Sequence, residues 1–121
     1  MELLLHTEMI IDSAHFLKGY IGKCANIHGH TWVCDVYFKG ESRLKNKIGI
    51  LVDFGIVKGL YDVLDHKILN DVIDVNPTAE NLVEWVYNEL RIVVDKDIKI
   101  KIRVHECMIG KDTYCEGGDW I

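Results

Sequence analysis

The clearest structural signal in the chain lies at residues 97–106, which read DIKIKIRVHE. Isoleucine or valine occupies every second position from Ile98 to Val104, and charged residues stand between them. Because successive side chains of a β-strand point to opposite faces, this alternation predicts a strand with one apolar and one polar face. The apolar face must be buried against other elements of the fold, which the rest of the sequence has to supply.

Three other segments show such alternation over a shorter length or less regularly: Leu3–Asp12, His30–Lys39 and about Thr113–Ile121. The last is interrupted by Gly117 and Gly118. Between the second and third strands, Lys39–Ile48 reads as a turn or loop, and extended structure is expected to resume at Ile50–Val52. The residues predicted to share one face are Leu3, Leu5, Met9 and Ile11 in the first strand and Trp32, Cys34, Val36 and Phe38 in the second.

Two helices are predicted after this loop. The first runs from about Phe54 to Asp65 with Asp53 as its N-cap, and the second begins at Thr78, whose hydroxyl can cap the free backbone N–H groups. Apolar residues recur at helical spacing at Ile56, Leu60, Val63 and Leu64 in the first helix and at Leu82, Trp85, Val86, Leu90 and Val93 in the second. We expect both stripes to pack against the sheet.

The order of elements, ββααββ, predicts an α+β fold: a four-stranded antiparallel sheet with both helices on one face. A chain of 121 residues suits a single domain covering residues 1–121. Such a sheet has two free edges, which must be covered or paired with another chain.

Composition narrows the possible partners. The formal net charge of −5 argues against nucleic acid as the main partner, because phosphate binding requires a basic surface. No apolar run reaches the roughly 18 residues needed to span a bilayer, and the apolar start lacks the basic region of an export signal. The four cysteines form no C-x-x-C pair. We therefore expect a reduced, cytoplasmic protein with no membrane partner.

Three histidines are candidate metal ligands. His28 and His30 flank Gly29 on an expected strand, so both imidazoles point to the same face. Zinc in a catalytic site takes three protein ligands and keeps a fourth position open. If the first two strands form a hairpin, His15 lies beside this pair and completes the set. His6 sits mid-strand and is expected to be an ordinary half-exposed residue.

Other side chains suited to acid–base chemistry surround this candidate site in the sequence. Cys24 precedes the histidine pair, and a nearby cation would favour its thiolate, which could act as a base, a nucleophile or a fourth ligand. Asp65 and His66 follow the first helix and could form a proton relay, although a histidine there could equally interact with the helix dipole. Glu106 continues an apolar strand face and would need a strong partner there, either a ligand with two N–H donors or a basic side chain.

Six segments of the chain together resemble the 6-pyruvoyl-tetrahydropterin synthase family, which includes 6-carboxy-tetrahydropterin synthases of the queuosine pathway. They are Ser13-Ala14-His15, Cys24-x-x-x-His28-Gly29-His30, Val52-Asp53-Phe54, Leu64-Asp65-His66, Pro77-Thr78-x-Glu80-Asn81 and Val104-His105-Glu106. The resemblance extends from about Leu4 to Tyr114. It implies the tunnelling fold, in which subunits join their edge strands into a barrel, and a homo-oligomer, either a trimer or a hexamer.

The resemblance also implies roles for the candidate residues. Zn²⁺ held by His15, His28 and His30 would bind the side-chain hydroxyls of 7,8-dihydroneopterin triphosphate. Cys24 would move protons on that side chain, and Asp65 with His66 would complete the relay. Glu106 would anchor the pterin ring.

Members of the family form different products. One branch eliminates triphosphate to give 6-pyruvoyl-tetrahydropterin, and another releases acetaldehyde and triphosphate to give 6-carboxy-5,6,7,8-tetrahydropterin. A third, aldolase-like branch uses a glutamate in the catalytic loop, and this chain has no acidic residue between Phe16 and Ile27. The spacing of Cys24 from His28 favours the carboxy-forming branch. A non-catalytic metal- or pterin-binding module is the rival hypothesis, but it would not need Cys24, Asp65 and His66.

Overall fold

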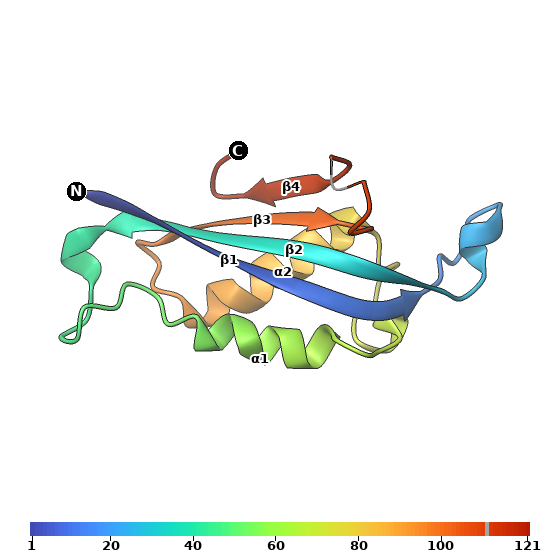
Figure 1. Cartoon of the computed structure of the whole chain (residues 1–121), viewed down its shortest axis with the longest axis horizontal. Coiled ribbons are helices and arrows are strands. Elements are labelled where there is room, and N and C mark those ends of the chain that lie inside the picture. Colours follow the sequence, from blue (N-terminus) through green and yellow to red (C-terminus); the bar gives the residue numbers. More distant parts are fainter. Residues whose placement is uncertain (111) are drawn as a thin grey trace.

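The computed structural model describes residues 1–110 and 112–121 and confirms the predicted α+β fold. Four strands form one antiparallel sheet in the order β1-β2-β3-β4, and two helices lie on one side of it (Figure 1). The elements are β1 (Glu2–His15), β2 (His28–Glu41), α1 (Gly55–Leu64), α2 (Ala79–Val93), β3 (Lys99–His105) and β4 (Cys115–Gly118). Short 3-10 helices occur at Lys23–Ala25, Ser42–Leu44 and Leu69–Asp71.

The hairpin of β1 and β2 is the longest feature of the sheet. Its register pairs every residue of β1 with one of β2, from Glu2 opposite Glu41 to His15 opposite His28. The loop between the two strands therefore projects from one end of the molecule (Figure 1). Both strands are longer than predicted because the pairing continues past polar residues that weaken the alternation.

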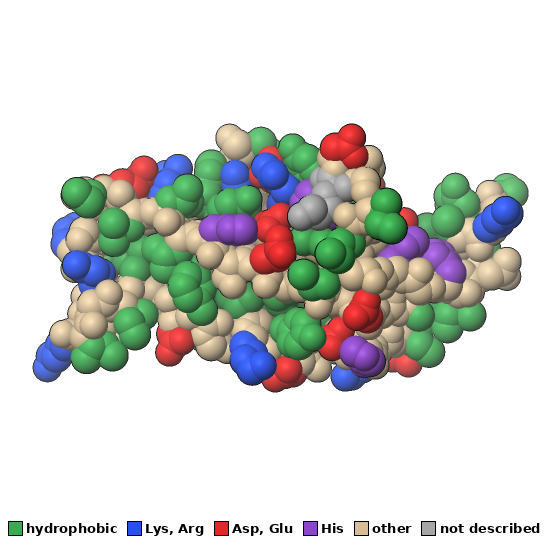
Figure 2. All heavy atoms as spheres, in the orientation of Figure 1, with side chains coloured by type: hydrophobic (Ala, Val, Ile, Leu, Met, Phe, Trp, Pro, Cys, Tyr) green, Lys and Arg blue, Asp and Glu red, His purple; other side chains and the backbone are tan. Residues whose placement is uncertain are grey.

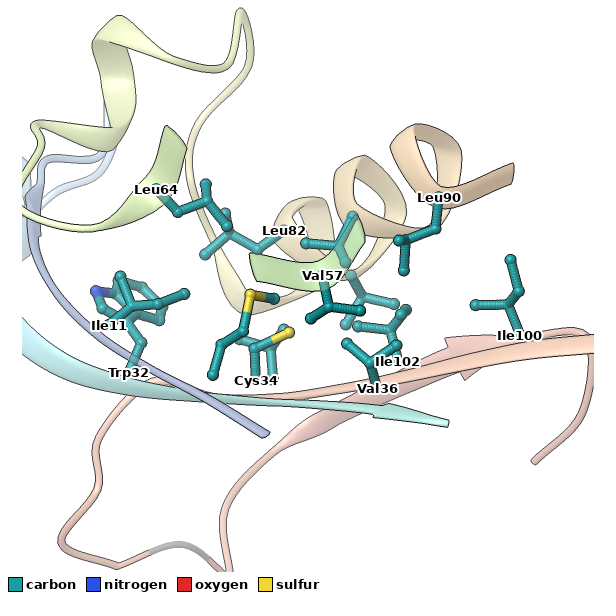
Figure 3. Close-up of a cluster of buried hydrophobic side chains, with 14 of the residues drawn as sticks. Ile11, Trp32, Cys34, Val36, Val57, Leu64, Leu82, Leu90, Ile100 and Ile102 are labelled. Carbon is teal, nitrogen blue, oxygen red and sulfur yellow. The ribbon is translucent and has the colours of Figure 1, made fainter. Parts of the chain in front are cut away.

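The core lies between the sheet and the helices (Figure 3). Ile100, Ile102 and Val104 of β3 are almost completely buried, as the alternation of apolar and charged residues at positions 97–106 predicts. Trp32, Cys34, Val36 and Phe38 of β2 are buried on the same side, together with Met9 and Ile11 of β1. The four cysteines are free thiols.

The helical faces differ from the prediction at their edges. In α1, Val57 is buried while Val63 is exposed, and in α2, Val83 is buried while Val93 is exposed. Spacing alone could not separate these neighbours, because each lies close to the boundary of its apolar stripe.

Of the two predicted N-caps, that of α2 is confirmed and that of α1 is wrong by one residue. Thr78 is confirmed as the N-cap of α2, since its Oγ1 accepts a hydrogen bond from the Asn81 N–H at 3.1 Å. The N-cap of α1 is Phe54, not Asp53, although the Asp53 carboxylate still accepts a hydrogen bond from the Gly55 N–H at 2.8 Å.

Three other predicted segments need correction. The residues 50–52 form no strand, because a loop with a turn at Gly49 leads directly into α1. Both β3 and β4 are shorter than predicted, and β4 ends at Gly118, whose φ of 140° departs from an extended backbone. No helix in the described residues is long and apolar enough to cross a membrane.

Candidate functional site

The three predicted histidines converge at the end of the β1–β2 hairpin. His15 ends β1 opposite His28, and His30 lies two residues further along β2, opposite Ser13. One ring nitrogen from each histidine lies within 4.8 Å of the others. The predicted juxtaposition of these side chains is therefore present, and it follows from the strand register.

Hydrogen bonds determine which nitrogen of two imidazoles faces this cluster. His15 Nδ1 lies 2.7 Å from the carbonyl oxygen of Pro77, and His28 Nδ1 lies 2.7 Å from that of Asn26. A carbonyl oxygen only accepts hydrogen bonds, so each Nδ1 carries a proton and each neutral ring presents a bare Nε2. Such carbonyl partners commonly orient histidines that bind metal ions.

The ring nitrogens that face the cluster lie close enough together to hold a metal ion. Nε2 of His15 and Nε2 of His28 are only 3.0 Å apart. When each Nδ1 carries the single proton of a neutral ring, the two Nε2 atoms have no hydrogen to share across this distance, and their lone pairs repel. Nε2 of His30 is also buried and has no hydrogen-bond partner among the described residues. Three imidazole nitrogens in this arrangement could hold a metal ion.

Burial prepares two of these rings for metal binding. His15 is 1% exposed, and the Trp32 indole lies edge-on to His15 and His30 with ring centroids 4.8 and 5.3 Å apart. Burial lowers the pKa of His15 and of His30 below the ordinary value of 6.5. Both rings are therefore neutral at pH 7, which is the form that binds a metal ion.

Glu106 lies beside the cluster but is not the buried carboxylate that its strand pattern predicted. Its Oε1 is 3.3 Å from His30 Nε2, without hydrogen-bond geometry, and its side chain is 47% exposed. The strand β3 ends at His105, so Glu106 leaves the apolar face. An open cleft adjoins it, lined by Ala79, Glu80, Val104, Thr113, Tyr114, Cys115 and Glu116.

Cys24 lies in the projecting loop between the first two strands, within the short helix Lys23–Ala25. Its side chain is partly buried, and its carbonyl oxygen accepts a hydrogen bond from the Leu17 N–H at 2.9 Å. The group of potential metal ligands consists of His15, His28 and His30, and the Cys24 sulfur is not part of it. Of the three roles considered for Cys24, the geometry does not support that of fourth ligand.

Asp65 and His66 form a hydrogen-bonded pair at the outer edge of β1. Asp65 Oδ2 lies 2.7 Å from His66 Nδ1, and Asp65 Oδ1 accepts a hydrogen bond from the Asp12 N–H at 2.9 Å. Burial opposes ionisation of Asp65, but these hydrogen bonds outweigh it and hold its pKa below the ordinary 3.8. Asp65 is thus a carboxylate at neutral pH, and it leaves His66 Nε2 free.

The backbone of His66 is in the left-handed region, with a φ of 56°. Non-glycine residues seldom adopt this conformation, which is found more often at functional sites. The His66 N–H donates to the Asp12 carbonyl oxygen at 2.8 Å, and the side chain is 78% exposed. The strand that supplies His15 therefore also holds the Asp65–His66 pair.

The sequence did not reveal a second cluster on the opposite face of the sheet. Asp35 is buried there and lies 2.8 Å from His6 Nε2 and 3.2 Å from His105 Nε2. His6 is half-exposed, as predicted. In the sequence, Asp35 is only one of several polar residues that alternate along the second strand, so its contact with His6 could not be predicted. This cluster shares no residue with the histidine cluster at the hairpin end.

The chain is similar in sequence to proteins that act on pterins. The family model described as 6-pyruvoyl tetrahydropterin synthase matches residues 5–116. A dihydroneopterin monophosphate aldolase of Pyrococcus furiosus is 36% identical over 94 residues, covering 74% of this chain and 76% of the relative. A 6-carboxy-5,6,7,8-tetrahydropterin synthase of Synechocystis is 32% identical over 96 residues, covering 72% and 74%.

A solved structure supports the fold. The 6-pyruvoyl tetrahydropterin synthase of Caenorhabditis elegans superimposes with a TM-score of 0.76 at 20% identity, covering 99% of this chain and 97% of that one. At this level of identity the similarity concerns the fold alone.

Proposed function

The chain belongs to the 6-pyruvoyl tetrahydropterin synthase family. We propose that it is a zinc-dependent lyase acting on 7,8-dihydroneopterin triphosphate. With the uptake of one water molecule, the proposed products are 6-carboxy-5,6,7,8-tetrahydropterin, acetaldehyde and triphosphate. The carboxy-pterin would serve deazapurine tRNA modification of the queuosine type. The observation that carries the proposal is the 3.0 Å separation of the bare Nε2 atoms of His15 and His28.

In this proposal, His15, His28 and His30 hold the zinc ion. When bound, zinc supplies Lewis acidity, which makes the protons of an attached hydroxyl and of the neighbouring carbon easier to remove. The carbonyl groups of Pro77 and Asn26 fix the orientation of two of these rings.

The other residues bind the substrate and move protons. Glu106 would accept hydrogen bonds from two N–H groups of the pterin, and the cleft beside it offers space for the ring. Cys24 would act as the base at the substrate side chain. His66 would exchange a proton at its free Nε2, because Asp65 holds the other ring nitrogen, Nδ1, in a hydrogen bond.

An oligomer would complete the site. The segment 65–68 runs beside β1 only at Asp12–Ala14, so the rest of that edge has no partner within the described chain. Apolar side chains, including Leu4 and Ile10 of β1, reach the surface, and Figure 2 shows apolar patches between interspersed charges on the face in view. We propose that copies join these edges to those of β4, as a trimer or hexamer, and that the exposed His66 serves a neighbouring subunit's site.

A second candidate is an aldolase acting on dihydroneopterin monophosphate. The 36% identity to the Pyrococcus furiosus enzyme favours it. The absence of an acidic residue between Phe16 and Ile27 weighs against the aldolase-like branch that depends on a loop glutamate. The pyruvoyl-forming reaction is the remaining catalytic alternative.

Product identification separates these activities. The protein, loaded with one zinc per chain, is incubated with 7,8-dihydroneopterin triphosphate and, separately, with the monophosphate, and the pterin products are identified by mass spectrometry. We expect 6-carboxy-5,6,7,8-tetrahydropterin and acetaldehyde from the triphosphate. A pterin that keeps its three-carbon side chain would identify the pyruvoyl-forming reaction, and a hydroxymethylpterin would identify the aldolase.

Substitution of Cys24 tests the catalytic role. Cys24→Ala is expected to lower kcat at least about 100-fold, the lower range for general-base catalysis, while zinc stays bound. Cys107→Ala is the matched control, because that thiol is exposed and has no proposed role. Full turnover by Cys24→Ala would disprove the role of this thiol, and zinc binding without any turnover by the unmodified protein would favour a non-catalytic module.

A further inference from the structure

Two asparagine side chains hold the backbone at the start of the projecting loop. Directly after His15 ends β1, the Phe16 N–H donates to Asn70 Oδ1 at 3.0 Å, and Asn70 Nδ2 donates to the Phe16 carbonyl oxygen at 2.9 Å. One side-chain amide thus satisfies both backbone groups of one residue.

The same pairing recurs two residues later. The Lys18 N–H donates to Asn76 Oδ1 at 2.8 Å, and Asn76 Nδ2 donates to the Lys18 carbonyl oxygen at 2.9 Å. The Asn76 carbonyl oxygen in turn accepts hydrogen bonds from the Thr78 N–H and from Asn81 Nδ2 at 2.8 and 2.9 Å. This second contact is therefore anchored in the first turn of α2.

Leu17, which lies between Phe16 and Lys18, is hydrogen-bonded to the backbone of Cys24. The Leu17 N–H donates to the Cys24 carbonyl oxygen at 2.9 Å, so the backbone that carries the thiol is held by a residue whose two neighbours are each paired with an asparagine. In the rest of the loop, the Ala25 and Asn26 N–H groups donate to the nearby Gly22 and Lys23 carbonyl oxygens, and Ile21 is almost fully exposed.

Only a primary amide can make this contact. Asparagine carries a donor and an acceptor side by side, as a peptide group does, whereas aspartate offers acceptors alone. The pairing of β1 with β2 ends at His15. Beyond it, the two side-chain amides bond to the backbone as the peptide groups of a neighbouring strand would.

We propose that Asn70 and Asn76 are positioning residues that set the place of Cys24 relative to the histidine cluster. The inference rests on the proposed function insofar as Cys24 is the catalytic base. Neither asparagine touches the substrate in this proposal, and His15 keeps its own support from the Pro77 carbonyl. Loss of either amide should therefore misplace Cys24 and leave the metal ligands in position.

The test compares three Asn→Asp variants of the zinc-loaded protein. Asn70→Asp and Asn76→Asp each remove one donor and place a carboxylate against a carbonyl oxygen. The control, Asn46→Asp, makes the same change in charge in the loop before α1, where the side chain uses only its oxygen to accept from the Ile48 and Ile50 N–H groups. The control is expected to behave as the unmodified protein does.

Three measurements are made on each variant. We expect kcat to fall about tenfold or more in Asn70→Asp and Asn76→Asp, because small displacements of a reacting group are costly, with KM changed less than about twofold. Zinc content should stay at one ion per chain. Alkylation of Cys24 at a single pH, followed on its peptide by mass spectrometry, should become at least about threefold faster as the loop opens locally, with exposed Cys107 as internal reference.

Unchanged kcat and unchanged Cys24 alkylation in both variants would overturn the proposal. An equal fall of kcat in Asn46→Asp would do so too, because the effect would then be general. If the unmodified protein has no turnover, the proposed function fails, and the alkylation rates alone still decide whether the asparagines position Cys24. If Asn76→Asp does not fold, Asn70→Asp gives the same decision.

Discussion

Replacing Asp119 by alanine should release the C-terminal segment from the rest of the fold. The Asp119 carboxylate accepts hydrogen bonds from the Tyr87 hydroxyl at 2.5 Å, from Arg91 Nη1 at 3.0 Å and from the Ile100 N–H at 2.8 Å. It therefore joins the end of the chain to α2 and to β3. Figure 1 shows this end turning back beside the sheet after β4.

The expected cost follows from these three contacts. The Ile100 N–H belongs to a fully buried residue, and an unsatisfied buried donor costs about 1–3 kcal/mol. The pair with Arg91 is about one quarter exposed on each side and contributes at most about 1 kcal/mol. The hydrogen bond from the Tyr87 hydroxyl adds about 1 kcal/mol. We therefore expect Asp119→Ala to lower the free energy of unfolding by about 2–5 kcal/mol, which corresponds to a fall in Tm on the order of 10 °C for a domain of this size.

The assay is urea unfolding at equal protein concentration, because any oligomer makes apparent stability depend on concentration. Asp62→Ala is the matched control. It removes the same charge from an exposed site on α1 and should change stability by less than about 0.5 kcal/mol. A loss below about 1 kcal/mol in Asp119→Ala, or an equal loss in Asp62→Ala, would show that the Asp119 carboxylate does not hold the C-terminal segment.

The same contacts predict a dependence on pH. Burial opposes ionisation of Asp119, but the hydrogen bonds from Tyr87 and Ile100 and the charges of Arg91 and Lys99 outweigh it and hold its pKa below the ordinary 3.8. Its stabilising effect is fully present above pH 3.8 and is lost as the pH falls through the lower pKa of the folded state. The difference between the unmodified protein and Asp119→Asn should shrink over that range, and a constant difference would contradict the assignment.

Three further substitutions test the metal cluster, a helix cap and a close backbone contact. His30→Ala should weaken zinc binding by at least about tenfold in a competition titration, since one of three ligands is lost, and unchanged affinity would exclude this residue as a ligand. Thr78→Ala should lower the free energy of unfolding by about 1 kcal/mol in urea, because the Asn81 N–H loses its acceptor; a neutral effect would contradict the capping role. Gly118→Ala should cost more than Gly19→Ala in the same measurement, because a Cβ at Gly118 would lie 2.2 Å from the Ile100 carbonyl oxygen, whereas one at Gly19 would meet nothing within 4 Å. Equal costs would mean that positive φ alone matters.

Much of the site was predictable because its signals are local. Alternation at residues 97–106 determined a strand and its buried face, and the hydroxyl of Thr78 marked the start of α2. The spacing of His28 and His30 placed two imidazoles on one face, since side chains two residues apart on a strand point the same way. These features depend on the number of residues between side chains of the same element, which can be read from the sequence.

The remaining features depend on contacts between distant segments. The register of β1 against β2 brings His15 to His28, and the loop before α2 places the Pro77 carbonyl against the His15 ring. Only the tertiary structure showed that Glu106 is half-exposed and that Asp119 holds the C-terminal segment. The physical reason is that local periodicity fixes which way a side chain points from its own element, whereas its neighbours are decided by how whole elements pair and pack.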